Sequence, residues 1–338
     1  MGAIARTKSA AARGDPPRIE DVTDATALEL DAQYRQLREE CGLLDRSARG
    51  KLIVSGGEAA DYLQGQLTND VEALSPGEGQ YAALLDRKGH MQAVMRVLRS
   101  SEEEIWIDTE PEALEAARRH LEMYKIGREV AIADLTGERA ILSLIGPRSV
   151  EFAGTAALPE NACVAASIGG VDCLAVGTGA GIDLIAKAAA AGRLRDALTA
   201  AGAAAVGPGA AEIVRIEAGT PRFGAEMGAG TMPAEAGIVE RAVSFTKGCY
   251  IGQEPVARLH YKGRPNRHLR GLVLSAPAAP GASLRLGEKE VGRVGSACVS
   301  PARGPVALAI VRREAEPGAE LAVGEDGVTA RVVDLPFG

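Results

Sequence analysis

The chain has 338 residues, more than one hydrophobic core usually supports, so two or three domains are expected. Hydrophobic residues make up 46% and charged residues 25%, a composition that excludes a disordered chain and a membrane-embedded one. The net charge of -7 argues against nucleic-acid binding, because nucleic-acid-binding proteins concentrate basic charge. We therefore expect a soluble globular protein with no nucleic-acid partner.

The N-terminal residues 1–18 are predicted to form a disordered tail. Residues 1–14 are basic and rich in small residues, but they lack the apolar segment of a secretory signal. No apolar run approaches the roughly 20 residues needed to span a bilayer. The five cysteines are scattered and form no Cys-x-x-Cys pair, which is typical of reduced thiols. We expect a cytoplasmic protein with no membrane contact.

The first half of the chain alternates predicted strands and helices. Apolar residues at near-helical spacing predict an amphipathic helix over Thr26–Glu40, with Gly42 as its C-cap. The elements expected next are a strand over 51–54, a helix over 57–67, a hairpin of 81–86 and 91–98, a strand over 105–108 and a helix over 111–124. This order indicates an α+β unit, an antiparallel sheet with helices on one face.

A second α+β unit and a β-rich segment follow. The elements expected in the second unit are strands over 140–145, 171–176 and 182–186 and a helix over 187–202. Between residues 275 and 338, short β-branched runs alternate with proline and glycine turns. That segment predicts a small β-barrel or sandwich.

The most specific signal is the string 247–254, Lys-Gly-Cys-Tyr-Ile-Gly-Gln-Glu. Glycines on both sides of Cys249 leave room for another molecule to approach the thiol. A helix opened by Pro255 would begin shortly after the thiol, and its positive end favours the thiolate. Lys247 and Arg258 would add to this effect if they point toward the sulfur. We predict that Cys249 is a reactive thiol and that Lys247 assists it.

The alternative is that Cys249 is a buried small hydrophobe, as free cysteines most often are. We accept that interpretation for Cys41, Cys163, Cys173 and Cys298. The polar and glycine neighbours of Cys249 favour a functional role instead.

The string 247–254 is similar to the signature of the YgfZ family, a branch of the glycine-cleavage T-protein superfamily. Other segments resemble landmarks of the same superfamily along nearly the whole chain, namely 34–45, 68–70, 144–147, 215–219 and 300–301. YgfZ proteins are linked to folate-dependent maturation or repair of iron-sulfur enzymes. The chain is therefore identified as a member of that branch.

The resemblance implies a fold and a cofactor. Family members fold as a three-domain cloverleaf with tetrahydrofolate in a central channel. We accordingly expect a first α+β domain of residues 19–50 with 138–265 that carries the cysteine motif. A second, ferredoxin-like α+β domain is expected at 51–137, and a C-terminal β-barrel at 266–338.

The resemblance also implies the site residues. The expected catalytic residues are Cys249 and Lys247. The expected folate-binding residues are Arg215, Glu217, Tyr250, Gln253, Glu254, Arg258 and Trp106. The family position of Arg215 lines the channel, although a solvated ion pair with Glu217 is an equal alternative. Trp106 and Tyr250 are the aromatic residues best placed to stack on a pterin.

Two departures from the aminomethyltransferases of the superfamily bear on activity. Those enzymes carry paired aspartates where this chain has Ala93 and Val94, and a glutamate where it has Ala180. Apolar residues cannot accept hydrogen bonds from a pterin or stabilise a cationic intermediate. These departures make glycine cleavage doubtful and predict modest folate affinity.

Two further features have alternative interpretations. The stretch 258–270 holds five basic residues and no acidic one, and it is either an anion site for a folate glutamate tail or a solvated linker. Cys249, His260 and His268 match no standard zinc spacing, so no metal site is predicted.

Three functions remain open at this point. The leading one is a folate-binding protein that supports iron-sulfur enzymes through Cys249, with those enzymes or their assembly proteins as partners. The second is a tetrahydrofolate-dependent aminomethyltransferase or another one-carbon transferase. The third is a non-catalytic folate-sensing scaffold.

Overall fold

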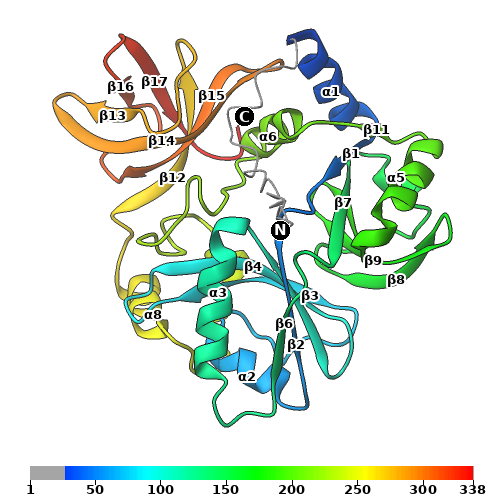
Figure 1. The fold of residues 1–338 in the computed structure, drawn as a ribbon. Coiled ribbons are helices and arrows are strands. Elements are labelled where there is room, and N and C mark those ends of the chain that lie inside the picture. Colours follow the sequence, from blue (N-terminus) through cyan, green and yellow to red (C-terminus); the bar gives the residue numbers. More distant parts are fainter. Residues whose placement is uncertain (1–26, 338) are drawn as a thin grey trace, which may run out of the picture.

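The computed structural model describes residues 27–337, which form three lobes around a common centre (Figure 1). Two lobes are α+β units and the third is a closed barrel of six strands, so the predicted fold class is confirmed. The tail predicted for residues 1–18 lies outside the described residues. Within the described range, no helix is long and apolar enough to cross a membrane.

The first lobe is a sheet of five strands in the order β3-β4-β5-β2-β6, with every neighbouring pair antiparallel. Its strands and helices are β2 (Gly50–Ser55), α2 (Ala59–Gln66), β3 (Gly79–Leu85), β4 (Met91–Arg99), β5 (Glu104–Thr109), α3 (Pro111–Tyr124) and β6 (Ala131–Asp134). Helix α3 buries Ala113, Ala117 and Leu121, which are spaced four residues apart and so share one face. A fifth strand distinguishes this sheet from the four-stranded sheet of the expected ferredoxin-like domain.

A later part of the chain completes the core of this first lobe. The core of the five-stranded unit includes Phe223, Ile238, Val243 and Val256 together with the strand residues. Helices α7 (Val239–Ala242) and α8 (Gln253–Lys262) belong to this segment. The cysteine motif therefore packs on the five-stranded unit and not, as expected, with the other α+β unit.

The second lobe is a six-stranded sheet in the order β11-β1-β7-β10-β9-β8. Its elements are α1 (Ala27–Glu39), β1 (Gly42–Asp45), β7 (Arg139–Ile145), α4 (Ser149–Ala153), β8 (Cys163–Ile168), β9 (Val171–Thr178), β10 (Gly181–Lys187), α5 (Ala191–Ala200), β11 (Ala204–Ala205) and α6 (Pro208–Glu217). All neighbouring strands are antiparallel except β1 and β11. The helix expected over 187–202 begins as a 3-10 turn at Ala188–Ala190 and continues as α5.

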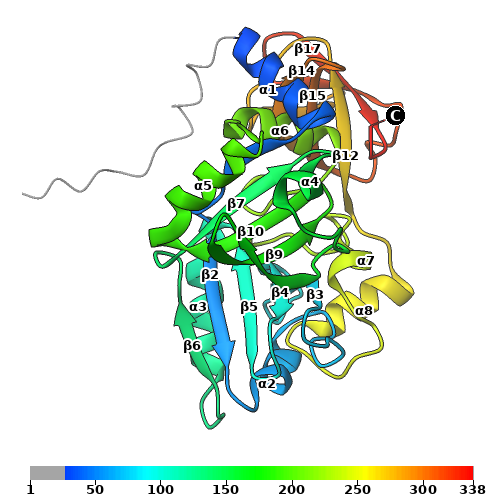
Figure 2. The same cartoon turned by 90° about the vertical axis from the view of Figure 1, so that its right-hand side faces the viewer.

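The two sheets lie against each other (Figure 2), and apolar side chains fill the joint between them. Leu98 and Trp106 of the five-stranded sheet share a buried cluster with Ile141, Val176 and Ile185 of the six-stranded sheet. Burial of these side chains removes apolar surface from water and so stabilises one arrangement of the two lobes.

The third lobe is a barrel with the strand order β12-β15-β14-β13-β16-β17. Its strands are β12 (Arg267–Leu274), β13 (Ser283–Leu286), β14 (Lys289–Ser300), β15 (Gly304–Arg312), β16 (Glu320–Val323) and β17 (Val328–Val333). Exposed and buried residues alternate along β16, as expected when one face of a strand lines a barrel interior. Helix α6 packs against β14, which links the barrel to the six-stranded unit.

Candidate functional site

Cys249 lies in a loop between α7 and α8, and we call residues 244–252 the Cys loop. It is the exposed one of the five free cysteines. Burial raises the pKa of Cys41 and Cys173 to about 11 and that of Cys298 to about 12, so these thiols are inert near neutral pH. Helix α8 begins at Gln253, shortly after the thiol. The predicted activation of Cys249 stays a prediction, but its exposure permits it.

Lys247 is buried at 8% exposure and points toward the first lobe. Its Nζ donates to the backbone oxygens of Gln64 at 2.5 Å, Leu67 at 2.6 Å and Asn69 at 3.1 Å. The ammonium group therefore engages the backbone of residues 64–69. The expectation that it assists Cys249 directly has no contact to support it in the described structure.

Tyr250, next to the thiol, is also buried, at 7% exposure. Its hydroxyl has no hydrogen-bond partner among residues 27–337, and burial raises its pKa to about 12. Its ring lies 5.1 Å from the Nζ of Lys247. Tyr250 thus packs in the core of the first lobe, which disfavours the expected stacking on a pterin.

The remaining motif residues lie on α8. The backbone N–H of Gln253 donates to the backbone carbonyl oxygen of Tyr250 at 3.3 Å. This bond links the Cys loop to the helix. Glu254 and Arg258 form an ion pair at 2.7 Å, with side chains 82% and 72% exposed. A solvated pair of this kind contributes little to stability or to ligand orientation.

His260 and the other zinc candidates are not gathered into one site. The His260 ring stacks on Phe245 with centroids 3.9 Å apart. Among residues 27–337, no group of three or more His, Cys, Asp or Glu side chains is arranged to hold a metal.

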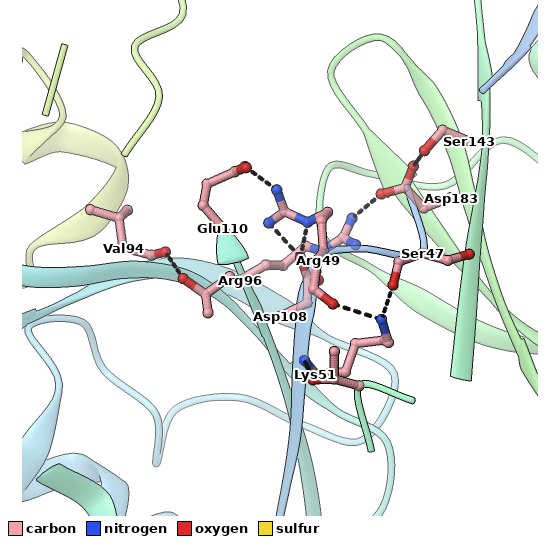
Figure 3. Close-up of polar contacts among 11 residues, drawn as sticks. Ser47, Arg49, Lys51, Val94, Arg96, Asp108, Glu110, Ser143 and Asp183 are labelled. Carbon is pink, nitrogen blue, oxygen red and sulfur yellow. Dashed lines mark hydrogen bonds and ion pairs between the residues drawn. The ribbon is translucent and has the colours of Figure 1, made fainter. Parts of the chain in front are cut away.

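A buried charge network lies where the two sheets meet (Figure 3). We call it the junction network, and its members are Arg49, Arg96, Asp108, Glu110, Ser143 and Asp183. Arg96 contacts Asp108 at 2.6 Å within the first lobe and Asp183 at 2.8 Å in the second. The pair Arg96 and Asp183 therefore joins the two sheets directly.

The network favours the charged forms of Asp108 and Arg49. Burial acts to raise the pKa of Asp108, but Arg96 and Arg49 outweigh it and keep that pKa below its ordinary value. Burial likewise acts to lower the pKa of Arg49, and Asp108 and Glu110 more than offset it. The Nη2 of Arg96 is buried and lacks a hydrogen-bond partner within the described part of the chain.

Ala93 and Val94, the apolar residues at the positions where aminomethyltransferases carry paired aspartates, border this network. Ala93 and Val94 lie on β4 at 0% and 3% exposure, and the Thr109 hydroxyl donates to the Val94 oxygen at 2.7 Å. Glu110 follows Thr109 and is paired with Arg49. The side chains of Glu110 and Arg49 are 23% and 19% exposed, so they form the open edge of the network.

Arg215 and Glu217 join the second lobe to the barrel. Arg215 contacts Glu212 at 2.7 Å, Glu226 at 3.1 Å and the Ser296 hydroxyl at 2.6 Å. Glu217 accepts from the Tyr34 hydroxyl at 3.0 Å and from the Ser300 hydroxyl at 2.5 Å. The alternative interpretation, an ion pair between Arg215 and Glu217, is not what the structure shows, because each residue has its own separate set of contacts.

A cleft of about 490 Å³ is lined by Glu226, one of the partners of Arg215. It lies between residues 225–231 and the barrel, and its lining includes Glu226, Thr231, Arg267, Arg293 and Arg312. Arg267 pairs with Glu235 at 2.7 Å and Arg293 pairs with Glu290 at 2.9 Å, so the lining carries charges of both signs.

Trp106 lies apart from these groups. It is 9% exposed in the apolar joint between the sheets, and its indole N–H donates to Glu104 at 2.9 Å. Its burial disfavours the expected stacking on a pterin, which stays a prediction.

The basic stretch 258–270 is largely neutralised. Arg267 pairs with Glu235 at 2.7 Å, and Arg270 pairs with Asp334 at 3.4 Å. Lys262 and Arg264 are exposed and have no acidic partner among the described residues. The structure therefore favours a mostly paired segment over a strong anion site.

The structure brings Cys249, Lys247, Tyr250 and Gln253 together, and it places Arg215 and Glu217 at a different junction. Sequence reasoning missed the junction network. The available signal was charge inside apolar strands, namely Arg96 within 91–98 and Asp108 at the end of 105–108.

Comparisons with known proteins show which protein family this chain resembles. Residues 20–247 match the GCVT N-terminal domain, and residues 267–337 match the glycine cleavage T-protein C-terminal barrel domain. A protein named aminomethyltransferase from Rubrobacter xylanophilus is 30% identical over 91% of this chain and 86% of its own length. One with the same name from Synechococcus is 31% identical over 91% of this chain and 90% of its own.

A solved structure is similar as well. The glycine cleavage system aminomethyltransferase T from Bartonella henselae aligns with a TM-score of 0.83 at 24% identity, and the match covers 92% of this chain and 90% of that one. At this identity the similarity establishes the three-lobed fold.

Proposed function

Because this chain belongs to the glycine cleavage T-protein family, we propose that it binds a reduced folate and transfers a one-carbon unit, as an aminomethyltransferase does. The observation that carries the proposal is the similarity to proteins of that name along 91% of the chain. Tetrahydrofolate is the expected cofactor.

The open edge of the junction network supplies the chemistry that a pterin needs. A pterin presents N–H donors, so its site needs an acceptor that keeps its charge. Ala93 and Val94 supply none. Glu110, paired with Arg49 and next to Thr109, is the partly exposed carboxylate at this place, and we propose that it accepts from the pterin.

The first experiment is calorimetry with tetrahydrofolate on the purified protein, followed by an assay for methylene-tetrahydrofolate formed from an aminomethyl donor. Glu110→Gln should weaken binding by about ten- to a hundredfold, since a hydrogen bond to a charged group contributes about 1.5–3 kcal/mol. Glu151→Gln, which alters an exposed carboxylate paired with Arg148, is the control. Absence of folate binding by the unaltered protein would refute the proposal.

The exposed thiol favours a second candidate function. Cys249 lies exposed in a loop whose sequence resembles the YgfZ signature, and aminomethyl transfer gives that thiol no evident task. In this second function the protein binds folate in the cytoplasm and supports the maturation or repair of iron-sulfur enzymes. Its partners are then those enzymes or their assembly proteins.

Complementation tests this second function. In cells that lack the native protein, Cys249→Ser should fold and bind folate but fail to restore iron-sulfur enzyme activity. Cys298→Ser, at a half-buried thiol in the barrel, is the matched control and should restore it. If Cys249→Ser rescues fully and the protein turns over in the transferase assay, the second function is refuted and one-carbon transfer is supported.

A further inference from the structure

The Cys loop is attached to the first lobe through the end of helix α2. Lys247 reaches the oxygens of Gln64, Leu67 and Asn69, the first of them 183 residues earlier in the chain. Gln64 lies in the last turn of α2, and Leu67 is its C-cap. A residue far along the chain thus binds the carboxyl end of this helix.

The carboxyl end of α2 favours a cation. The last carbonyl groups of a helix have no partner within the helix, and they carry the negative end of its dipole. Helix α2 has no basic residue in its own last turn. The ammonium of Lys247 supplies both the missing donors and the missing charge.

These contacts occupy the whole ammonium group. It has three N–H donors, and each of the three oxygens takes one. The Tyr250 ring lies against the Nζ, and the side chain is almost fully buried. No donor is left for a substrate or for the thiol.

Further bonds hold the start of the loop. The Ser244 N–H donates to the Thr68 oxygen at 3.0 Å, and the Thr68 hydroxyl donates to the Ala242 oxygen at 2.5 Å. Thr68 lies between Leu67 and Asn69, so it belongs to the same turn that binds Lys247.

The end of the loop rests on the turn between β3 and β4. Gly252 has φ +83°, and a Cβ at this position would lie 2.4 Å from the Asp86 oxygen. Pro255 similarly approaches Gly89, where a Cβ would lie 3.0 Å from the proline ring. The loop is therefore held at both ends, and Cys249 lies between the two attachments.

We propose that Lys247 is a positioning residue, whose ammonium fixes the Cys loop on the carboxyl end of α2 and so sets where the Cys249 thiol is presented. This role replaces the expected direct assistance to the thiol. The inference rests on the second candidate function only in taking Cys249 as the functional thiol. Its test needs no folate, so its failure can be told apart from that of the proposed function.

The test compares three variants. Lys247→Met removes the ammonium, and Thr68→Val loosens the same attachment without changing charge. Lys51→Met is the matched control, because Lys51 is also fully buried and its Nζ donates to the backbone oxygens of Ser47 at 2.7 Å and Arg49 at 2.6 Å, away from the Cys loop. Each variant is measured by hydrogen exchange of the loop amides and by the rate of Cys249 alkylation with iodoacetamide, located by peptide mass spectrometry.

Lys247→Met and Thr68→Val should both speed exchange of amides 244–252 by about tenfold, the effect of losing one net hydrogen bond. Both should change the alkylation rate in the same direction, and Lys51→Met should change neither quantity. If Lys247→Met alone alters alkylation, the ammonium acts on the thiol through its charge, and the proposal is wrong. It is also overturned if Lys247→Met leaves the loop unchanged or if Lys51→Met has the same effect. Should Lys247→Met not fold, Thr68→Val decides by itself, and wild-type exchange and alkylation in that variant would overturn the proposal.

Discussion

Replacing Arg96 with methionine should uncouple the two sheets. The Arg96 guanidinium contacts Asp108 at 2.6 Å and Asp183 at 2.8 Å, and the side chains of both aspartates are at most 6% exposed. Removing one partner of a buried ion pair costs about 3–5 kcal/mol, because it leaves charge buried without compensation. Arg49 still holds Asp108, and Ser143 still donates to Asp183 at 2.6 Å. We therefore expect a loss of about 3 kcal/mol in the free energy of unfolding, the lower end of that range.

The single tryptophan, Trp106, allows this loss of stability to be measured at the joint between the two sheets. Trp106 lies in the apolar joint of the same two sheets, so its fluorescence reports on their separation. Urea unfolding followed by this fluorescence should show the loss for Arg96→Met. Arg148→Met, which removes two surface ion pairs, with Glu40 and with Glu151, among side chains that are at least 44% exposed, should cost less than about 1 kcal/mol. Equal costs for the two variants would refute the reasoning.

The effect of Arg96→Met should also depend on pH. The folded-state pKa of Asp108 is lowered, so its contribution is complete above the unfolded pKa of about 3.9 and is lost as the pH falls through the folded value. The charge of Arg96 contributes to the lowered pKa of Asp108. The difference between the two proteins should therefore shrink in acid, and a difference that grows below pH 4 would contradict the assignment.

Three further predictions concern the Cys loop and the barrel junction. Burial lowers the pKa of Lys247 from 10.5 to about 8, with Asp70 and Glu72 opposing, so the ammonium fixes the Cys loop at a cost in stability. The unfolded chain binds an extra proton between these two pH values. Relative to Lys247→Met, the wild-type protein should therefore gain up to about 3 kcal/mol of stability from pH 8 to 10.5 in urea titrations. Gly252→Ala should cost more than Gly281→Ala in thermal unfolding, because φ is +83° and +85° at the two glycines but only the Cβ at Gly252 would meet backbone. Glu217→Gln should lower the free energy of unfolding by about 1–3 kcal/mol, because two hydroxyl groups donate to this buried carboxylate. If chemical denaturation shows no loss of stability, Glu217 does not stabilise the junction between the second lobe and the barrel.

Much of the fold follows from local sequence signals. The helix predicted over 111–124 coincides with α3 because proline opens it and its apolar residues keep helical spacing. Among the strands of the two α+β units that the sequence did not predict are β6 and β8. Both lie at the edge of a sheet, and neither buries more than one of its residues, so they lack the apolar alternation that identifies a strand.

The site was predicted less completely, for a different reason. The exposure of Cys249 follows from its glycine and polar neighbours. The partners of Lys247 and Arg96 do not, because the former lie about 180 residues away and the latter include a residue of the other sheet. Local patterns predict what a side chain prefers, and tertiary packing decides which group it meets. The same gap placed the cysteine motif in the wrong lobe.

The path of the chain has a consequence for how the protein folds during synthesis. The five-stranded unit starts at Gly50, but its core is closed only by residues 223–256, after the whole six-stranded unit has been made. Until then, the apolar residues that Ile238, Val243 and Val256 will cover stay open to water. Contacts across such long separations form slowly, and exposed apolar surface invites aggregation. A nascent chain halted before residue 223 should therefore need a chaperone, and the Cys loop should be among the last parts to reach its final structure.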